Sequence, residues 1–276
     1  MGINDYVLVD GKKVFVQEGG VLSIEGIKNI QEIEGLDKLV HLRAIYIYSY
    51  YLRSIKGLEN LINLRELHIC GSEHLTKIEG LENLINLETL DLGGNRIERI
   101  AGLENLKNLK FLYFKTLNND DPGNPIRKIE GLDELKNLEL LDFYQCEIIK
   151  IEGLENLTNL KTLSLAENHI KDIEGLDTLV NLERLYLSCN EISKIKGLGN
   201  LANLKELRLD ANIIQEIEGL DKLVNLEVLS FTSNPLQLPG KYYVDREILT
   251  PYFKELVNLK ELNENPYPQS EKYRII

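Results

Sequence analysis

The sequence is poor in cysteine, has no long apolar run and carries no excess of positive charge, and each shortage excludes a class of protein. Its three cysteines, Cys70, Cys146 and Cys189, form no CxxC pair, so we expect free thiols and neither a disulfide framework nor a zinc site. No stretch of 18 apolar residues is present, which argues against a membrane-spanning helix. The opening residues MGINDY lack the basic and apolar regions of a signal peptide, so the expected location is the cytoplasm.

The charge balance is acidic. The formal net charge is −12 and the isoelectric point is about 5.0. A chain of this charge is repelled by nucleic acid and by anionic membrane surfaces. Neither is therefore an expected partner.

One 22-residue unit, residues 160–181, recurs along most of the chain. Leu163 and Leu165 are two residues apart, which is the spacing of a strand. From Ile170 onward the apolar residues come every third position, which fits a tight helical or an extended turn that returns the chain, and not a strand. A single unit cannot bury its apolar side, but stacked copies can.

A glycine fixes the register of these copies. The intervals between successive glycines are 22, 23, 22, 29, 22, 22, 22 and 22 residues, and the glycines are Gly35, Gly57, Gly80, Gly102, Gly131, Gly153, Gly175, Gly197 and Gly219. Each glycine follows an isoleucine by two positions and directly precedes a leucine. The repetition predicts one elongated solenoid from Val21 to Leu262.

The residues Leu160, Leu163, Leu165 and Asn168 make the pattern L-x-x-L-x-L-x-x-N. In this pattern the chain resembles the leucine-rich-repeat family, in the 22-residue class that includes a regulatory subunit of protein phosphatase 1 and the bacterial internalins. The resemblance implies an α/β repeat solenoid, a curved horseshoe with a parallel sheet on its concave face. The asparagines at the strand exits should bond backbone groups of the corner. They are Asn95, Asn168, Asn190, Asn212 and Asn234, and they are missing at Tyr50, Ser72, Leu117 and Cys146.

The chain divides into residues 1–20, 21–240 and 241–276. Asp10-Gly11 between two β-rich runs predicts a hairpin over residues 6–16 that caps the open end of the solenoid. Residues 241–256 have helical apolar spacing, broken at Pro251, and Leu259 with Leu262 should form a last partial strand. This end resembles the helical C-terminal cap of the phosphatase-subunit branch, and the matching residues are Asn234, Pro235, Leu236, Tyr243, Pro251, Leu259 and Leu262. Residues 265–276 are expected to be irregular.

Residues between the strand leucines should face solvent on the concave side. The candidate partner-binding residues are Tyr46, Tyr48, His68, Asp91, Tyr113, Lys115, Asp142, Tyr144, Tyr186, Arg208 and Asp210. Exposed tyrosines on a rigid sheet are typical anchors of protein interfaces. The alternative is that these aromatic residues only favour strands and pack on one another.

The longest repeat adds seven residues within Thr116–Lys128, next to the small residues Gly93 and Gly94. This loop could contact a partner, could hold calcium through Asn118, Asn119, Asp120 and Asp121, or could be a tolerated insertion.

Cys70, His68 and Asp91 could suggest a nucleophile with its base. No oxyanion donors, enclosed pocket or phosphate-binding glycine loop accompany them, and a metal site would lack a fourth ligand. We therefore expect no enzyme activity, no metal and no cofactor.

The sequence favours a non-enzymatic, monomeric scaffold that binds a folded protein on its concave face. The family resemblance implies a phosphatase catalytic subunit as one possible partner. The alternative is a secreted or surface adhesin, similar to the internalins, that binds a host receptor.

Overall fold

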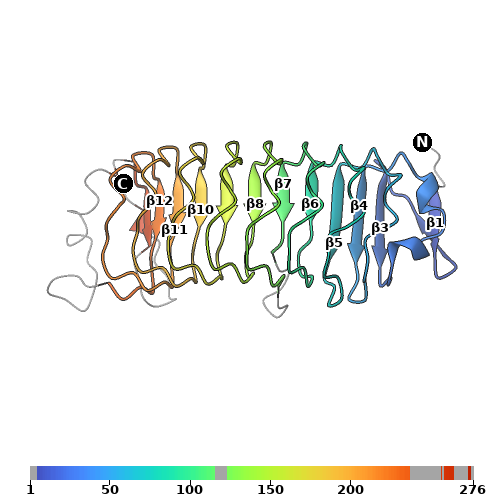
Figure 1. Cartoon of the computed structure of the whole chain (residues 1–276), viewed down its shortest axis with the longest axis horizontal. Helices are drawn as coiled ribbons and strands as arrows, with labels where there is room; N and C mark the ends of the chain where they lie inside the picture. The colour runs from blue at the N-terminus through green and yellow to red at the C-terminus, as the bar shows by residue number, and fades with distance from the viewer. Residues whose placement is uncertain (1–4, 116–122, 237–255, 257, 264–272, 275–276) are drawn as a thin grey trace.

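The computed structural model describes residues 5–115, 123–236, 256, 258–263 and 273–274. Within this part of the chain, successive coils stack along one axis, and each contributes one strand to a common sheet (Figure 1). The described residues form no α-helix, and their only helical turns are the 3-10 helices η1 (Ile30–Glu32) and η2 (Leu36–Lys38). The expected parallel-sheet solenoid is confirmed.

The strands fall into two sheets. An antiparallel hairpin joins β1 (Tyr6–Val9) to β2 (Lys12–Phe15). In the long sheet, β3 to β13 pair in parallel with their sequence neighbours, and β14 pairs with β13 antiparallel. The strands of the long sheet are β3 (Val21–Glu25), β4 (Ala44–Tyr48), β5 (Glu66–Cys70), β6 (Thr89–Asp91), β7 (Phe111–Tyr113), β8 (Leu140–Asp142), β9 (Thr162–Ser164), β10 (Arg184–Tyr186), β11 (Glu206–Arg208), β12 (Val228–Ser230), β13 (Glu261–Asn263) and β14 (Tyr273–Arg274).

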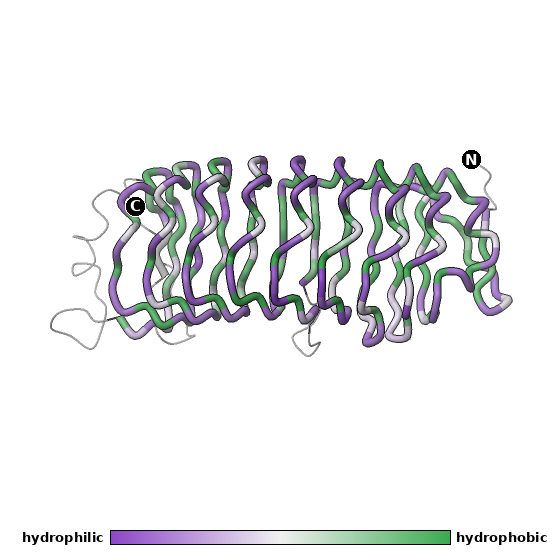
Figure 2. The backbone as a smooth tube through the Cα atoms, viewed as in Figure 1, coloured by the Kyte–Doolittle hydropathy of each residue, from purple (hydrophilic) through white to green (hydrophobic). Residues whose placement is uncertain are grey.

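The core is a continuous stack of leucine and isoleucine layers. Leu163 in β9 pairs in register with Leu141 in β8 and Leu185 in β10, and all three side chains are fully buried. Figure 2 shows hydrophobic and hydrophilic stretches alternating in the same way from coil to coil. Each coil therefore buries its apolar side only against its two neighbours.

The return segments are chains of tight turns. The backbone N–H of Leu179 donates to Leu176 O, and that of Leu182 donates to Leu179 O, at 3.0 and 2.9 Å. These i to i+3 bonds bring every third side chain to the same side. This accounts for the apolar spacing of three that follows each strand.

The repeated glycine is required where the return segment touches the preceding coil. Gly197 has φ +72°, and a Cβ at this position would lie 2.4 Å from Ile173 O. Positive φ favours glycine, and the contact leaves no room for a side chain. From Gly131 onward two separate constraints therefore keep the register residue a glycine, whereas at Gly35, where a Cβ would meet nothing within 4 Å, the positive φ acts alone.

The corner asparagines bond the backbone as expected. Asn190 donates from Nδ2 to Leu165 O and Leu187 O at 2.9 and 3.0 Å, and its Oδ1 accepts from Ile170 N at 3.0 Å. Asn168 and Asn212 make the same set of bonds in their own coils.

The corners that lack this asparagine use other groups. Ser72 Oγ donates to Leu52 O at 2.6 Å. The expectation that Leu117 leaves its corner without an amide is wrong, because Asn124 takes that place. Its Nδ2 donates to Leu92 O and Phe114 O. The insertion lies between the strand and the corner residue, so counting along the repeat reached the wrong position.

The hairpin forms where the Asp10-Gly11 pair places it. Both turn residues have positive φ, 49° and 72°, as a type I′ turn requires. Val7 is fully buried in the core, and Leu8 exchanges backbone hydrogen bonds with Glu34. The hairpin thus covers the first coil.

At the C-terminal end, the structure confirms some of the expectations drawn from the sequence and contradicts one. Leu259 is buried and β13 contains Leu262 in register with Leu229, so the last partial strand is confirmed. The expectation of an irregular tail is wrong at Tyr273–Arg274, which form β14. The helical cap falls on residues that lie outside the described ones, except for Leu256.

Candidate functional site on the open face of the sheet

The outward side chains of β4 to β12 form a surface that we call the open face. Strand register places residues of successive coils side by side, as Tyr46 with His68 and Tyr113 with Asp142. The central row of the open face is Tyr46, His68, Asp91, Tyr113, Asp142, Ser164, Tyr186, Arg208 and Ser230. The second row, two residues later in each coil, contains Tyr48, Lys115, Tyr144 and Asp210. The structure therefore places all eleven candidate residues on one side of the sheet.

The N-terminal part of this face is held by ring stacking. The Tyr46 and His68 rings stack with centroids 4.5 Å apart, and His68 Nδ1 lies 3.4 Å from Asp91 Oδ2. Tyr46 OH donates to Glu66 Oε2 at 3.0 Å. Burial raises the pKa of Tyr46 and of its neighbour Tyr48. Both phenols are therefore neutral hydrogen-bonding groups at neutral pH.

Cys70 has the environment of a structural thiol. Its side chain is buried, and this burial, with the nearby Asp91, raises the pKa of the thiol. Nucleophilic cysteines need the opposite shift. The structure thus gives no support to a Cys70–His68 nucleophile, and among the described residues no group of three metal-ligating side chains is found.

The centre of the open face combines an aromatic ring with two carboxylates. Tyr113 in β7 lies between Asp91 and Asp142 of the adjacent strands. Lys115 Nζ lies 5.2 Å from the centroid of the Tyr113 ring, within cation–π range. Burial raises the pKa of Asp142, whose Oδ1 accepts a hydrogen bond from Tyr144 N at 2.9 Å. This face therefore holds a carboxylate that is poorly solvated.

The other two candidate tyrosines are fixed by glutamates of the next coil. Tyr144 OH donates to Glu167 Oε1 at 2.7 Å, and this bond raises the pKa of Tyr144 to about 12. Tyr186 OH donates to Glu206 Oε2 at 3.2 Å. The same glutamate accepts from Arg208 Nε at 2.6 Å. The side chains are thus oriented before any partner arrives.

Asp210 differs from the other candidates because its oxygens are used inside the protein. Oδ1 accepts from Thr232 N and Thr232 Oγ1 at 2.9 and 2.7 Å and also from Ser230 Oγ, and Oδ2 accepts from Ser188 Oγ at 3.2 Å. A carboxylate with four donors has little acceptor capacity left. Asp210 therefore holds neighbouring side chains of the open face in place and offers little acceptor capacity to a partner.

A third row of outward residues was missed by the sequence reasoning. It lies two residues before the central row and contains Phe111 and Leu140, which are partly buried neighbours beside Tyr113. The same strand alternation that gave the other two rows would have found it. Phe111, Tyr113 and Leu140 together form an apolar centre on the open face.

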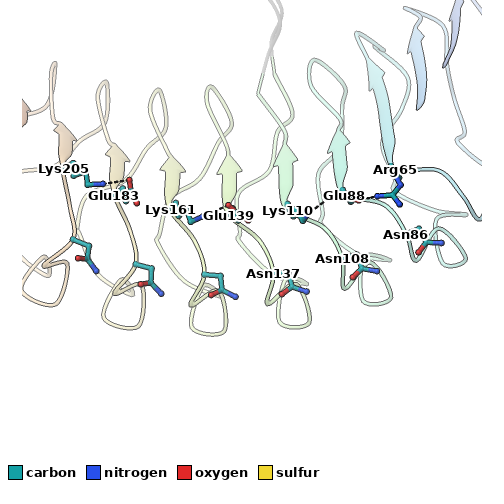
Figure 3. Close-up of a pocket in the computed structure, with 13 residues that line it drawn as sticks. Arg65, Asn86, Glu88, Asn108, Lys110, Asn137, Glu139, Lys161, Glu183 and Lys205 are labelled. Atoms are coloured by element: carbon teal, nitrogen blue, oxygen red, sulfur yellow. Dashed lines mark hydrogen bonds and ion pairs between the residues drawn. The ribbon is translucent and has the colours of Figure 1, made fainter. Parts of the chain in front are cut away.

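A groove runs along the edge where the chain enters the strands. Its volume is about 790 Å³, and Figure 3 shows charged side chains in one row and asparagines such as Asn108 and Asn137 in a second row. The charged row belongs to what we call the charge ladder. Each member after the first donates its backbone N–H to the carbonyl of the member before it at 2.8 Å, and the members are Arg43, Arg65, Glu88, Lys110, Glu139, Lys161, Glu183, Lys205, Glu227 and Lys260.

From Arg65 onward the charge ladder alternates in sign. Lys110 lies 2.8 Å from Glu88, Lys161 lies 2.7 Å from Glu139, and the same pairing continues through Lys205 and Lys260. The hydrogen bond from Lys110 lowers the pKa of Glu88. Sequence reasoning missed this ladder, although from Arg65 onward its members are the residues that follow the last Asn-Leu pair before each strand.

The inserted loop is described only from Gly123. Residues 116–122 lie outside the described ones, so the calcium hypothesis on Asn118, Asn119, Asp120 and Asp121 falls there too. The described end is anchored, because Arg96 donates to Gly123 O at 3.3 Å. No helix in the described residues has the length and hydropathy that crossing a bilayer would need.

Comparisons with known proteins agree with this geometry. The family model described as "Leucine Rich repeats (2 copies)" matches residues 85–134, 136–178 and 180–222. A search of curated proteins finds no match. None of the comparisons supports a specific similarity to the phosphatase regulatory subunit.

Several solved structures are similar to this stack of coils. An internalin of Listeria monocytogenes, inlF, is 23% identical, with a TM-score of 0.63 over 92% of this chain and 84% of that one. Internalin C2 of the same species is 28% identical, with a TM-score of 0.63 over 71% and 84%. TLR13 in its complex with ssRNA13 is 24% identical, with a TM-score of 0.73 over 88% and 35%. Since the family match spans residues 85–222 and the same coil runs from β3 to β13, the chain belongs to the leucine-rich-repeat family.

Proposed function

We propose that this chain is a non-enzymatic interaction scaffold that binds a folded protein on its open face. The observation that carries the proposal is that the outward side chains of this face are already fixed by contacts between coils. Tyr46 stacks on His68, and Tyr144 and Tyr186 donate to glutamates of the next coil. Binding to a pre-formed surface avoids the entropy cost of ordering side chains at the interface.

The apolar centre would supply most of the binding energy. Phe111, Tyr113 and Leu140 lie side by side on rigid strands, and aromatic residues in such positions often dominate interface energetics. Asp91 and Asp142 flank this centre, and the pKa of Asp142 is raised because its carboxylate is poorly solvated. The complementary partner surface carries an apolar side chain next to a lysine or arginine. Such a cation would replace the solvation that Asp142 lacks.

A folded protein fits the charge of the molecule better than a polyanion does. The net charge of −12 opposes binding to nucleic acid. The similarity to TLR13, whose solved complex contains RNA, concerns the fold. The cytoplasm and a monomeric state remain part of the proposal, as does the division into residues 1–20, 21–240 and 241–276.

An adhesin that binds a host receptor is the second candidate. The similarity to internalin C2, at 28% identity, favours it. A phosphatase catalytic subunit is a third candidate partner, on the sequence resemblance of the C-terminal end, from Asn234 to Leu262, to the phosphatase-subunit branch. All three use the same open face, so the partner's identity separates them.

The test compares capture from the source lysate by three forms of the protein. The first is wild type, the second is Tyr113→Ala with Tyr144→Ala and Tyr186→Ala, and the third is Tyr50→Ala with Tyr51→Ala. Tyr50 and Tyr51 are 58% and 52% exposed but lie outside the three rows of the open face. We expect one protein to be retained by wild type and by the control pair and lost by the triple variant.

The retained protein is then purified and titrated. Loss of three anchors should weaken its affinity by about a hundredfold or more. A melting curve of the triple variant close to wild type assigns that loss to binding and not to unfolding. Equal retention by all three forms would rule out the open face as the binding surface.

A further inference from the structure

The charge ladder breaks its alternation at its N-terminal end. Arg43 and Arg65 are consecutive members, since Arg65 N donates to Arg43 O at 2.8 Å. Every later cation of the ladder has at least one glutamate as its neighbour, as Lys110 has Glu88 and Glu139. Arg43 has Arg65 on one side. On the other side its backbone N–H donates to Gly20 O, and glycine supplies no side chain.

The Arg43 side chain is exposed, and no described residue compensates its charge. In the described part of the chain, no carboxylate lies within ion-pair distance of its guanidinium. The carboxylates that pair with the neighbouring pocket residues are already engaged: Asp5 Oδ2 lies 3.2 Å from His41 Nε2, and Glu88 pairs with Arg65. An arginine has five N–H donors in a planar fork and stays charged at any physiological pH.

Arg43 lines a pocket whose lining side chains carry hydrogen-bond donors. The pocket has a volume of about 320 Å³ and is lined by His41, Arg43, Asn63, Arg65 and Asn86. The asparagine amides are held in place, because Asn63 Nδ2 donates to Val40 O and Asn86 Nδ2 donates to Ile62 O, both at 2.8 Å. Each amide nitrogen keeps a second hydrogen for another acceptor. Two guanidinium groups and two fixed amides therefore meet at one concave point.

We propose that this pocket binds a small oxyanion, a phosphate or a sulfate group, with Arg43 as the main ligand and Arg65 and Asn63 beside it. Guanidinium groups bind such anions through paired, charge-assisted hydrogen bonds. The anion takes the place that a glutamate occupies elsewhere in the charge ladder. None of the lining residues belongs to the open face, so this site is independent of the protein-binding surface proposed above.

The test is a titration of 15N-labelled protein with inorganic phosphate, sulfate and acetate, each at the same ionic strength set with chloride. We expect saturable shifts of the arginine Nε–H signals of Arg43 and Arg65 with phosphate or sulfate. Acetate distinguishes a tetrahedral anion from a carboxylate. If acetate alone saturates these signals, the ligand class proposed here is wrong.

Two substitutions separate a site from general charge effects. Arg43→Glu continues the alternation of the charge ladder, so the fold should be kept, and it should weaken phosphate binding at least about tenfold. Arg53→Glu makes the same charge change at an exposed arginine outside the pocket and should leave binding unchanged. Shifts that grow linearly without saturation, or that are equally reduced in both variants, would overturn the proposal.

Discussion

A single asparagine closes each regular corner of the coil. Asn190 is buried and bonds four backbone groups of two coils, Leu165 O, Leu187 O, Ser188 O and Ile170 N. Backbone groups in this position have no access to water, so removal of the amide leaves them unsatisfied.

Asn190→Ala should therefore lower the free energy of unfolding by about 1–3 kcal/mol. The matched control is Asn181→Ala, whose exposed amide donates to Thr158 O at 2.9 Å on the opposite edge. Chemical denaturation of both variants measures the difference. Similar losses for the two would show that burial of the corner does not set the cost.

Replacement of Asp142 should raise the free energy of unfolding, whereas replacement of Asn190 should lower it. Burial raises its pKa above the ordinary value of 3.8, so the ionised form is less favourable in the folded protein than in the unfolded chain. Its contribution to stability is complete below pH about 3.8 and is lost as the pH rises through the folded pKa. Asp142→Asn should thus raise stability at neutral pH, and the gain should fade below pH about 4. A variant that is equally or less stable than wild type at pH 7 would contradict this reasoning.

At the scale of single residues, the sequence was sufficient to predict the corner asparagines wherever the repeat is regular. The five corner asparagines could be named because each follows the last buried apolar residue of its strand segment by three positions, as Asn168 follows Leu165 and Asn234 follows Phe231. Asn124 could not, since it follows Phe114 by ten positions. Only the structure shows that Asn124, which follows the inserted residues, bonds the backbone of this corner.

At the scale of the coil, the fixed glycine makes the return segment fit its neighbour. Gly197→Ala would bring a methyl group to 2.4 Å from Ile173 O in a backbone with φ +72°. Overpacking of this kind costs about 1–3 kcal/mol, and the left-handed conformation adds to it. Gly199→Ala is the control, because a Cβ there meets nothing within 4 Å and its φ is not positive. Thermal melts should show a marked loss for the first variant and little change for the second.

The charge ladder links coils through their surface charges. Glu139→Lys would place three cations in a row with Lys110 and Lys161. The melting temperature should fall at low ionic strength and recover in about 1 M salt, where the screening length is about 3 Å. Glu139→Gln removes the attraction without adding repulsion and should show a smaller, similarly screened effect. A loss that is independent of salt would indicate a packing defect instead.

The open face shows the limit of what one coil's sequence can reveal. Strand alternation was enough to place Tyr113, Tyr144 and Tyr186 on one side. The alternation does not reveal what each side chain contacts, because Tyr144 meets Glu167 and Tyr186 meets Glu206 only after the coils stack. For the same reason Asp210 could not be recognised as an internal acceptor for residues of β12 and the corner after it.

At the scale of the whole molecule, the solenoid has contacts only between adjacent coils, so its ends decide where unfolding starts. Val7 of the hairpin is the fully buried residue that covers the first coil. Val7→Asp should therefore increase hydrogen exchange in β3 and β4 while β9 and β10 stay protected. Lys12→Asp, at an exposed position of the same hairpin, is the control. Uniform exchange along the molecule would show that the coils unfold as one unit.

The alternating charges of the ladder divide the coils into two kinds, one with a basic member and one with an acidic member. If the coil that carries Glu183 were lost, Lys161 would stand next to Lys205, and the loss of a lysine coil would likewise join two glutamates. Loss or duplication of two consecutive coils leaves every neighbour opposite in charge. With intervals of 22 residues, this solenoid can therefore grow or shrink without electrostatic conflict in steps of 44 residues. The unit that evolution or a designer can copy freely is the pair of coils, although the fold repeats with each one.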